Sequence, residues 1–121
     1  MQKLESRGLV LFNRNYREND KLVKIFTEQA GKRIFFVRGG GSGKLSAVIQ
    51  PLTIAEFMMT VNDEGLSFIE DYSHAESFKE ITSDIFKLSY ATYLAALTDA
   101  AIADGVADAQ LFAFLEKTLE L

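Results

Sequence analysis

The hydrophobic and polar positions of this chain divide it into a strand-like part and a helix-like part. Up to residue 72, short apolar runs are separated by polar or glycine-containing turns. Beyond residue 73, apolar residues recur every three to four positions. Short bounded runs favour β-strands, and the longer period is that of an amphipathic helix. The pattern therefore predicts a β-domain followed by helices.

Five strands are expected in the first part, at Gly8–Phe12, Lys21–Thr27, Lys32–Arg38, Leu52–Val61 and Leu66–Tyr72. The first run is apolar throughout, which is typical of a strand buried on both faces. In the second strand, Lys24 falls in phase with Leu22 and Phe26, while Val23 and Ile25 take the other face. Such mixed faces suit a strongly curved sheet.

The connections between these strands follow known turn chemistry. The polar segment 13–20 is rich in Asn and Asp and predicts a loop. Gly31 predicts a hairpin turn before the third strand, and residues 62–65 predict another before the fifth. A glycine-rich tract at 39–43 precedes a short helical segment at 44–50, and Pro51 marks the entry to the fourth strand.

Five short strands with a helical insertion after the third match the layout of an OB-fold, a small Greek-key barrel that often binds single strands. The predicted fold class is therefore mainly β with α: a five-stranded antiparallel OB-fold barrel followed by the first helices of an α-helical domain. The expected domains are residues 1–76, the barrel, and residues 77–121, the start of the helical domain.

Two helices are expected after the barrel. Thr82 or Ser83 can cap a helix that runs to about Ala103 and ends at Gly105, and Asp108 can cap the last helix. The apolar positions predicted to form their core faces are Phe86, Tyr90, Tyr93, Leu94, Leu97, Leu111, Phe112, Phe114, Leu115 and Leu119. The last helix carries apolar residues on more than one side. We therefore expect a fragment of a longer chain, whose bare helix faces would favour homo-oligomers.

The net charge of −4 hides a marked asymmetry. Residues 1–50 carry ten basic and four acidic side chains, a net charge of +6, whereas residues 51–121 carry three basic and thirteen acidic ones, a net charge of −10. Seven of the basic residues lie within Gly8–Arg38, the most strand-like third of the chain. A basic face on an acidic body is typical of a nucleic-acid-binding domain. The alternative is solvated charge that discourages edge-to-edge aggregation of strands.

Several kinds of site are disfavoured by composition. The chain has no Cys and a single His, His74, so disulfides, thiolate metal sites and most His-based catalysis are excluded. The glycine tract lacks the Walker spacing, because Arg38 and Leu45 stand at two of the required positions. No nucleophile–base pair is visible. We expect no metal, no cofactor and no enzymatic activity; an enzyme subdomain is the weakest alternative.

The DNA-binding residues predicted from charge and position are Arg14, Tyr16, Arg17, Lys21, Lys24, Lys32, Arg33, Arg38 and Lys44. Lysine and arginine that neutralise phosphates give affinity that depends on salt and not on base sequence. Tyr16 is included because aromatic side chains stack on the bases of single strands. The other aromatic residues of the strands are predicted to be barrel core: Phe12, Phe26, Phe35, Phe36, Phe57 and Phe68.

An ordered set of residues also resembles a known family. The set comprises Gly8-Leu-Val-Leu, the segment 13–20, Leu22…Phe26-Thr-Glu…Gly31-Lys32, Gln50-Pro51-Leu52, Gly65-Leu66…Glu70, Tyr93-Leu…Leu97-Thr-Asp99 and Asp108…Leu111-Phe112…Leu115. In this order they resemble the N-terminal part of the bacterial recombination mediator family RecO, over essentially the whole chain.

The resemblance implies a DNA-binding mediator of recombinational repair that binds single- and double-stranded DNA, anneals complementary strands and helps to load RecA. It also implies partnership with RecR and with single-stranded-DNA-binding protein, and a bacterial cytoplasmic, nucleoid-associated location. An interaction adaptor that mainly docks RecR or single-stranded-DNA-binding protein stays open as the alternative. The chain departs from the family in its loop after the third strand, which is glycine-rich and less basic. Many members also carry a Cys-based zinc site further on; this chain has no Cys and ends too early to show one.

Overall fold

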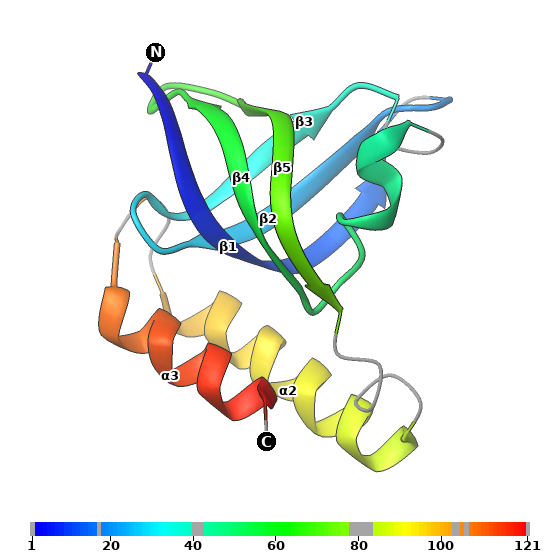
Figure 1. Ribbon diagram of the computed structural model, residues 1–121, viewed down its shortest axis with the longest axis vertical. Helices are drawn as coiled ribbons and strands as arrows, with labels where there is room; N and C mark the ends of the chain where they lie inside the picture. Colours follow the sequence, from blue (N-terminus) through cyan, green and yellow to red (C-terminus); the bar gives the residue numbers. More distant parts are fainter. Residues whose placement is uncertain are drawn as a thin grey trace.

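A computed structural model describes residues 2–16, 18–39, 43–77, 84–102, 105 and 107–120. Its elements, in chain order, are β1 (Gln2–Asn15), β2 (Lys21–Thr27), β3 (Gly31–Val37), the 3-10 helix η1 (Lys44–Ala47), β4 (Thr53–Val61), β5 (Ser67–Ser77), α2 (Ile85–Ala101) and α3 (Ala109–Glu120). Strands and helices form two layers, with the helices side by side beneath the barrel (Figure 1). The predicted order of five strands followed by two helices is confirmed.

The five strands close into a barrel in the order β1-β2-β3-β5-β4. Four of the pairings are antiparallel, and β1 completes the closure by pairing with β4 as well as β2. The contact between β3 and β5 is parallel and short, with Phe35 opposite Ser67 and Phe36 opposite Phe68. This is the arrangement of a small OB-fold barrel, with one parallel seam in an otherwise antiparallel sheet.

The first strand is much longer than the predicted Gly8–Phe12. Its N-terminal half pairs with β4 and its C-terminal half with β2, so one bent strand serves two neighbours. The pairing with β2 shifts by one residue between Val10 and Phe12, which marks a β-bulge. Burial on both faces is confirmed for residues 9–11, because Val10 joins the core inside the barrel while Leu9 and Leu11 join a second core between the barrel and the helices.

Two cores therefore hold the molecule together. The barrel interior contains inward-facing residues such as Val23, Ile25 and Phe35, closed at one end by Leu45 of η1. The second core joins the outer wall of the barrel to both helices, where Phe26 of β2 packs among helix residues. Alternation along β2 places Ile25 in the barrel interior and its neighbour Phe26 in the second core, so this end of the strand is buried on both faces.

The helix boundaries differ in part from those predicted. Asp84 caps α2, its side chain accepting hydrogen bonds from the backbone N–H groups of Phe86 and Lys87; Thr82 and Ser83 lie outside the described residues. The helix ends at Ala101, and Gly105 is not its cap: the Gly105 N–H donates to the carbonyl of Lys32, against β3. Asp108 caps α3 as predicted, accepting from the N–H of Leu111 at 2.9 Å.

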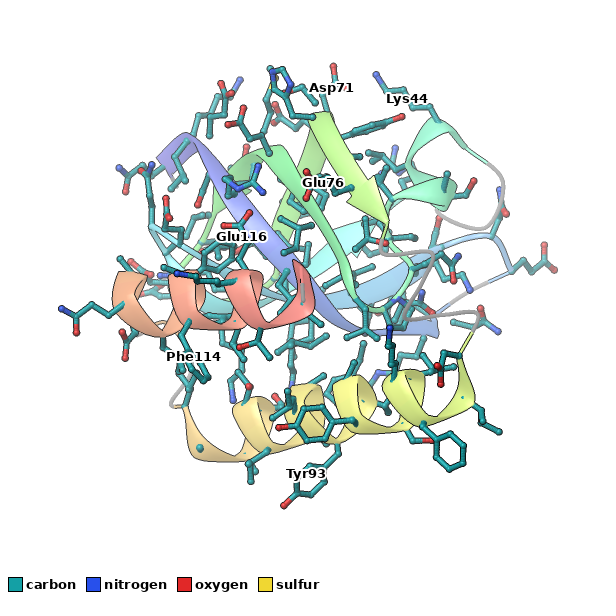
Figure 2. The ribbon with its side chains drawn as sticks, turned by 60° about the horizontal axis from the view of Figure 1, so that its bottom comes forward. Lys44, Asp71, Glu76, Tyr93, Phe114 and Glu116 are labelled. Atoms are coloured by element: carbon teal, nitrogen blue, oxygen red, sulfur yellow. The ribbon has the colours of Figure 1, made fainter. Side chains whose placement is uncertain are left out.

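The face of α2 that packs on the barrel is not the predicted one. Small residues are buried there, namely Ala91, Ala95 and Thr98. Four of the large apolar residues predicted as core are instead exposed, from 50% for Leu97 to 84% for Phe86, while Leu94 is partly buried. Tyr93 projects away from the barrel (Figure 2). Helix α3 does bury Phe112, Leu115 and Leu119, while Phe114 is exposed. No helix among the described residues is long and apolar enough to cross a membrane.

Candidate nucleic-acid interface

The outer surface of β2 and β3 presents apolar side chains to solvent. Alternation turns Val23 and Ile25 of β2 into the barrel, so Leu22 and Lys24 point outward. On β3, Phe35 and Val37 are fully buried, whereas Ile34 and Phe36 are only partly covered. The two strands supply half-exposed apolar residues to the same outer surface. Together these residues form an exposed apolar patch, which is typical of a binding site.

Cross-strand pairing aligns these side chains into a row. Arg14 of β1 lies opposite Leu22, Leu22 lies opposite Phe36, and Phe36 lies opposite Phe68 of β5. The rings of Phe36 and Phe68 meet edge to face, with centroids 6.0 Å apart and an interplanar angle of 76°. The row therefore runs across four strands and ends in an arginine.

Tyr16 extends this surface from the loop between β1 and β2. Its ring meets Phe36 edge to face, with centroids 5.9 Å apart and an interplanar angle of 89°. The Tyr16 backbone N–H donates to the carbonyl of Asp20, and the Asp20 carboxylate accepts from the N–H of Gly39. These two bonds tie the loop to the end of β3. We call the outward set the aromatic face; it consists of Phe12, Tyr16, Leu22, Ile34, Phe36 and Phe68.

A shallow groove of about 320 Å³ lies beside this row. It is lined by Phe12, Asn13, Arg14, Leu22, Lys24 and Ile34. Apolar walls with a cationic rim suit a flat, partly apolar ring that carries an anionic group, which is the chemistry of a nucleotide. The Asn13 side chain donates to the carbonyl of Ile49 at 2.8 Å and so is held by the segment after η1.

The predicted basic residues fall into two groups. Arg14 and Arg38 are exposed and Lys21 is half-buried, and none of the three forms an ion pair within the described part of the chain. Arg14 lies opposite Leu22 of the aromatic face, while Lys21 and Arg38 lie at the strand ends beside the Tyr16 loop. These three cations border the aromatic surface. Arg17 lies outside the described residues.

The other four predicted cations are paired with carboxylates. Lys24 and Lys32 both contact Asp99 of α2, at 2.9 and 3.2 Å. Arg33 contacts Asp63 in the loop between β4 and β5 at 2.9 Å, and its Nε–H donates to the carbonyl of Ala30. Lys32 is only 5% exposed, so it is not accessible to a phosphate in this fold. Arg33 is engaged by Asp63 and Ala30, and neither Lys32 nor Arg33 belongs to the aromatic face.

Lys44 lies on η1 and is the last of the paired cations. It pairs with Asp71 of β5 at 3.2 Å, at the top of the view in Figure 2. The N–H of Tyr72 and the ammonium of Lys44 lower the pKa of Asp71 below its usual value. Both side chains are largely exposed, so this pair contributes little to stability.

Three aromatic residues of the face were predicted to be core. Phe12 and Phe68 are each 39% exposed, and Phe36 is partly exposed, so the prediction is wrong for them. It is confirmed for Phe26, Phe35 and Phe57, which are fully buried. Strand alternation gave a signal against the core assignment. Phe36 lies opposite Leu22, and Leu22 shares a face of its strand with Lys24. A face that carries a lysine is not purely interior.

The described residues contain no cluster of side chains that could hold a metal ion. No three His, Asp or Glu side chains among them come together as a metal site would require. His74 is exposed and sits at a backbone φ of 49°, within the irregular part of the pairing between β4 and β5.

The chain matches known protein families over most of its length. Residues 1–78 match the family described as recombination protein O N terminal, and residues 82–121 match recombination protein O C terminal. The chain is 93% identical to the DNA repair protein RecO of Streptococcus thermophilus (strain CNRZ 1066) over all 121 residues, which make up 47% of that relative. It is 63% identical, again over its full length, to the DNA repair protein RecO of Streptococcus suis (strain 05ZYH33), of which it covers 46%.

The DNA repair protein RecO of Streptococcus pneumoniae (strain Hungary19A-6) is 60% identical over the same 121 residues, which are 47% of its length. The chain thus spans about half the length of the curated relatives it matches. Since the N-terminal family match alone covers residues 1–78 of 121, the chain belongs to the recombination protein O (RecO) family.

Proposed function

We propose that this chain binds DNA through the aromatic face, as part of a recombination mediator in DNA repair. The observation that carries the proposal is the row from Arg14 through Leu22 and Phe36 to Phe68, with Tyr16 packed against it. Aromatic rings stack on bases of any sequence, and cations at the rim hold the backbone. In OB-folds the outer face of strands 2 and 3 and the loop between strands 1 and 2 are the usual binding surface.

This binding mode suits strand annealing. Affinity that comes from phosphates and from stacking does not depend on base identity, so any exposed strand can be held. Bases that are held without specific hydrogen bonds keep their pairing edges available to a complementary strand. We extend the proposal to binding of both single- and double-stranded DNA and to annealing of complementary strands. The protein would pass strands to RecA together with RecR and single-stranded-DNA-binding protein. Its proposed location is the bacterial cytoplasm, at the nucleoid.

Salt dependence gives the direct test. Labelled oligo-dT is titrated with the 121-residue chain at several salt concentrations, and binding is followed by fluorescence anisotropy. If Arg14, Lys21 and Arg38 each neutralise one phosphate, log K should fall against log salt with a slope of about −2. Arg14→Glu and Arg38→Glu should weaken binding and flatten the slope. Lys117→Glu, the same charge reversal at an exposed site on α3, is the matched control.

No binding at low salt would contradict the proposal for this chain. Binding that is weakened equally by all three reversals would show a response to net charge alone, and would remove the aromatic face from the proposal. Annealing is measured separately, as the rate at which complementary labelled oligonucleotides pair with and without the protein.

The interaction adaptor is the second candidate, and one observation favours it. Helix α2 exposes a continuous set of apolar residues, namely Ile85, Phe86, Tyr90, Tyr93 and Leu97. Apolar surface of this extent marks protein interaction sites. Sedimentation of the chain with purified RecR, and separately with single-stranded-DNA-binding protein, tests this candidate. Self-association through the same helices stays a prediction, which the light-scattering mass of the chain alone checks.

A further inference from the structure

Asp99 joins the helices to the barrel beside the groove. It lies in the last turn of α2 (Ile85–Ala101), and its Oδ1 is 2.9 Å from the ammonium of Lys24 and 3.2 Å from that of Lys32. Lys24 comes from β2 and Lys32 from β3, so one carboxylate meets two neighbouring strands. Burial by itself raises the pKa of Asp99, but its contacts with the two lysines outweigh this and hold the pKa below the ordinary value.

The fold accounts for Lys32 without any ligand. Its side chain is buried, and its ammonium also donates to the main-chain carbonyl of Asp99. Helix α2 has no basic residue of its own in its last turn, and a positive charge is favourable at a helix C-terminus. Lys32 therefore supplies from the barrel the charge that this helix end lacks.

Lys24 is in a different position. Its side chain is 26% exposed and lines the groove together with Phe12 and Leu22, while its ammonium contacts Asp99. The lysine thus stands between a carboxylate on one side and a groove suited to a nucleotide on the other. A phosphate oxygen and a carboxylate oxygen offer an ammonium the same kind of charged acceptor, so they compete for it.

We infer that Asp99 acts as an internal competitor of DNA phosphate for Lys24, and so sets the affinity of the groove. The inference rests on the proposed function. While Asp99 is ionised, its carboxylate, which Lys24 shares with Lys32, offsets part of the charge of Lys24, so a phosphate gains less by approaching it. Removing the carboxylate charge makes Lys24 a full phosphate contact. Asp99 then lowers affinity without touching DNA, which keeps a strand exchangeable.

The test compares oligo-dT binding by four proteins, the wild type, Asp99→Asn, Lys24→Met and the double variant, across a salt series. Asp99→Asn should bind more tightly, with the slope of log K against log salt steeper by about 0.7, the value for one added contact to a single strand. Its gain over the wild type should therefore be roughly two- to threefold smaller at about 200 mM than at about 50 mM salt. In the Lys24→Met background, Asp99→Asn should produce no gain.

A matched control separates this effect from net charge. Asp108→Asn makes the same change of charge on the helical layer, and Asn serves as well as Asp at the N-cap that Asp108 provides. It should leave affinity close to that of the wild type. An equal gain from Asp108→Asn, or a gain from Asp99→Asn that survives in the Lys24→Met background, overturns the inference. If the wild type binds no oligo-dT, the proposed function itself fails, which is a different result.

A measurement on the unmodified protein covers the case in which Asp99→Asn does not fold. The side-chain carboxyl carbon of Asp99 is titrated by NMR, with and without saturating oligo-dT. Phosphate that draws Lys24 away should raise the pKa of Asp99 towards its ordinary value. An Asp99 pKa that is unchanged by bound oligo-dT overturns the inference while leaving DNA binding intact.

Discussion

Phe26 of β2 and Phe112 of α3 meet edge to face across the junction between barrel and helices, with ring centroids 5.8 Å apart and planes inclined at 67°. Both side chains are almost completely buried. Their contact lies in the core that joins Leu9 and Leu11 of β1 to both helices. The helical layer is therefore attached by hydrophobic packing, and the ion pair from Arg7 to Glu116 and those to Asp99 surround that packing.

Phe112→Ala should lower the free energy of unfolding by about 3–5 kcal/mol, because it removes a buried ring and leaves a cavity against Phe26. Phe114→Ala is the matched control: the same truncation on the same helix, at a side chain that is 62% exposed, should cost within about 0.5 kcal/mol. Urea unfolding measures both. Equal losses from the two variants would mean that α3 is not seated on the barrel through Phe112.

At Gly8, β1 passes close to side chains of the barrel interior. A Cβ at this position would lie 2.6 Å from Cγ2 of Ile25 and 3.2 Å from the ring of Phe57. Gly8→Ala should therefore destabilise the fold by about 1–3 kcal/mol through overpacking. At Gly65 the nearest atom to an added Cβ is 3.5 Å away, an ordinary contact, so Gly65→Ala is the control. A Gly8→Ala variant as stable as Gly65→Ala in urea would contradict this account of β1.

The strands were predictable because alternation and turn chemistry act locally. Val23 and Ile25 had to share a face opposite Lys24, and Gly31 takes the positive φ of 75° that its turn requires. The extent of β1 was not predictable in this way. Its polar N-terminal half becomes a strand only because β4, some fifty residues later in the chain, pairs with it.

Helix α2 shows why periodicity found the helix but not its buried face. Residues 91, 95 and 98 form one stripe of small side chains, and residues 86, 90, 93 and 97 form another of large ones. Both stripes have helical spacing, so the pattern cannot choose between them. Close approach of the helix to the barrel favours the small stripe, and that is a property of the tertiary packing.

The candidate site was half predictable. Charge clustering pointed to β1, β2 and β3, and Arg14, Lys21 and Arg38 do border one surface. Lys32 and Arg33 do not contribute to this surface, because they pair with Asp99 and Asp63. Both carboxylates lie far from these cations in the sequence. The aromatic residues were assigned to the core by residue type, yet a bulge after Val10 turns Phe12 outward, and a local pattern does not reveal a bulge.

Acid should weaken the attachment of α2 through Asp99. Its pKa is lowered in the folded state from an ordinary value of 3.8 by contact with Lys24 and Lys32, despite burial. A carboxylate whose pKa is depressed by folding contributes stability above its unfolded pKa and loses it as the pH falls through the folded pKa. The stability difference between the wild type and Asp99→Asn should thus be full above about pH 5 and shrink below about pH 4.

Urea unfolding of both proteins across that range measures the difference. Lys24→Met should show a shallower loss in acid than the wild type, because one of the two contacts that lower the pKa of Asp99 is gone. A difference between the wild type and Asp99→Asn that stays constant down to about pH 3 would show that the lysines do not favour the ionised form of Asp99.

Phe36 is the centre of the aromatic face, since it touches both Tyr16 and Phe68. Phe36→Ala should weaken oligo-dT binding by about 1 kcal/mol or more, roughly fivefold or more in Kd, because one stacking platform is lost. The slope of log K against log salt should not change, since no cation is removed. Met58→Ala truncates an exposed apolar side chain on β4, outside the face, and should bind as the wild type does. Phe36→Ala that binds normally, while Arg14→Glu does not, would leave a purely electrostatic surface and remove base stacking from the mechanism.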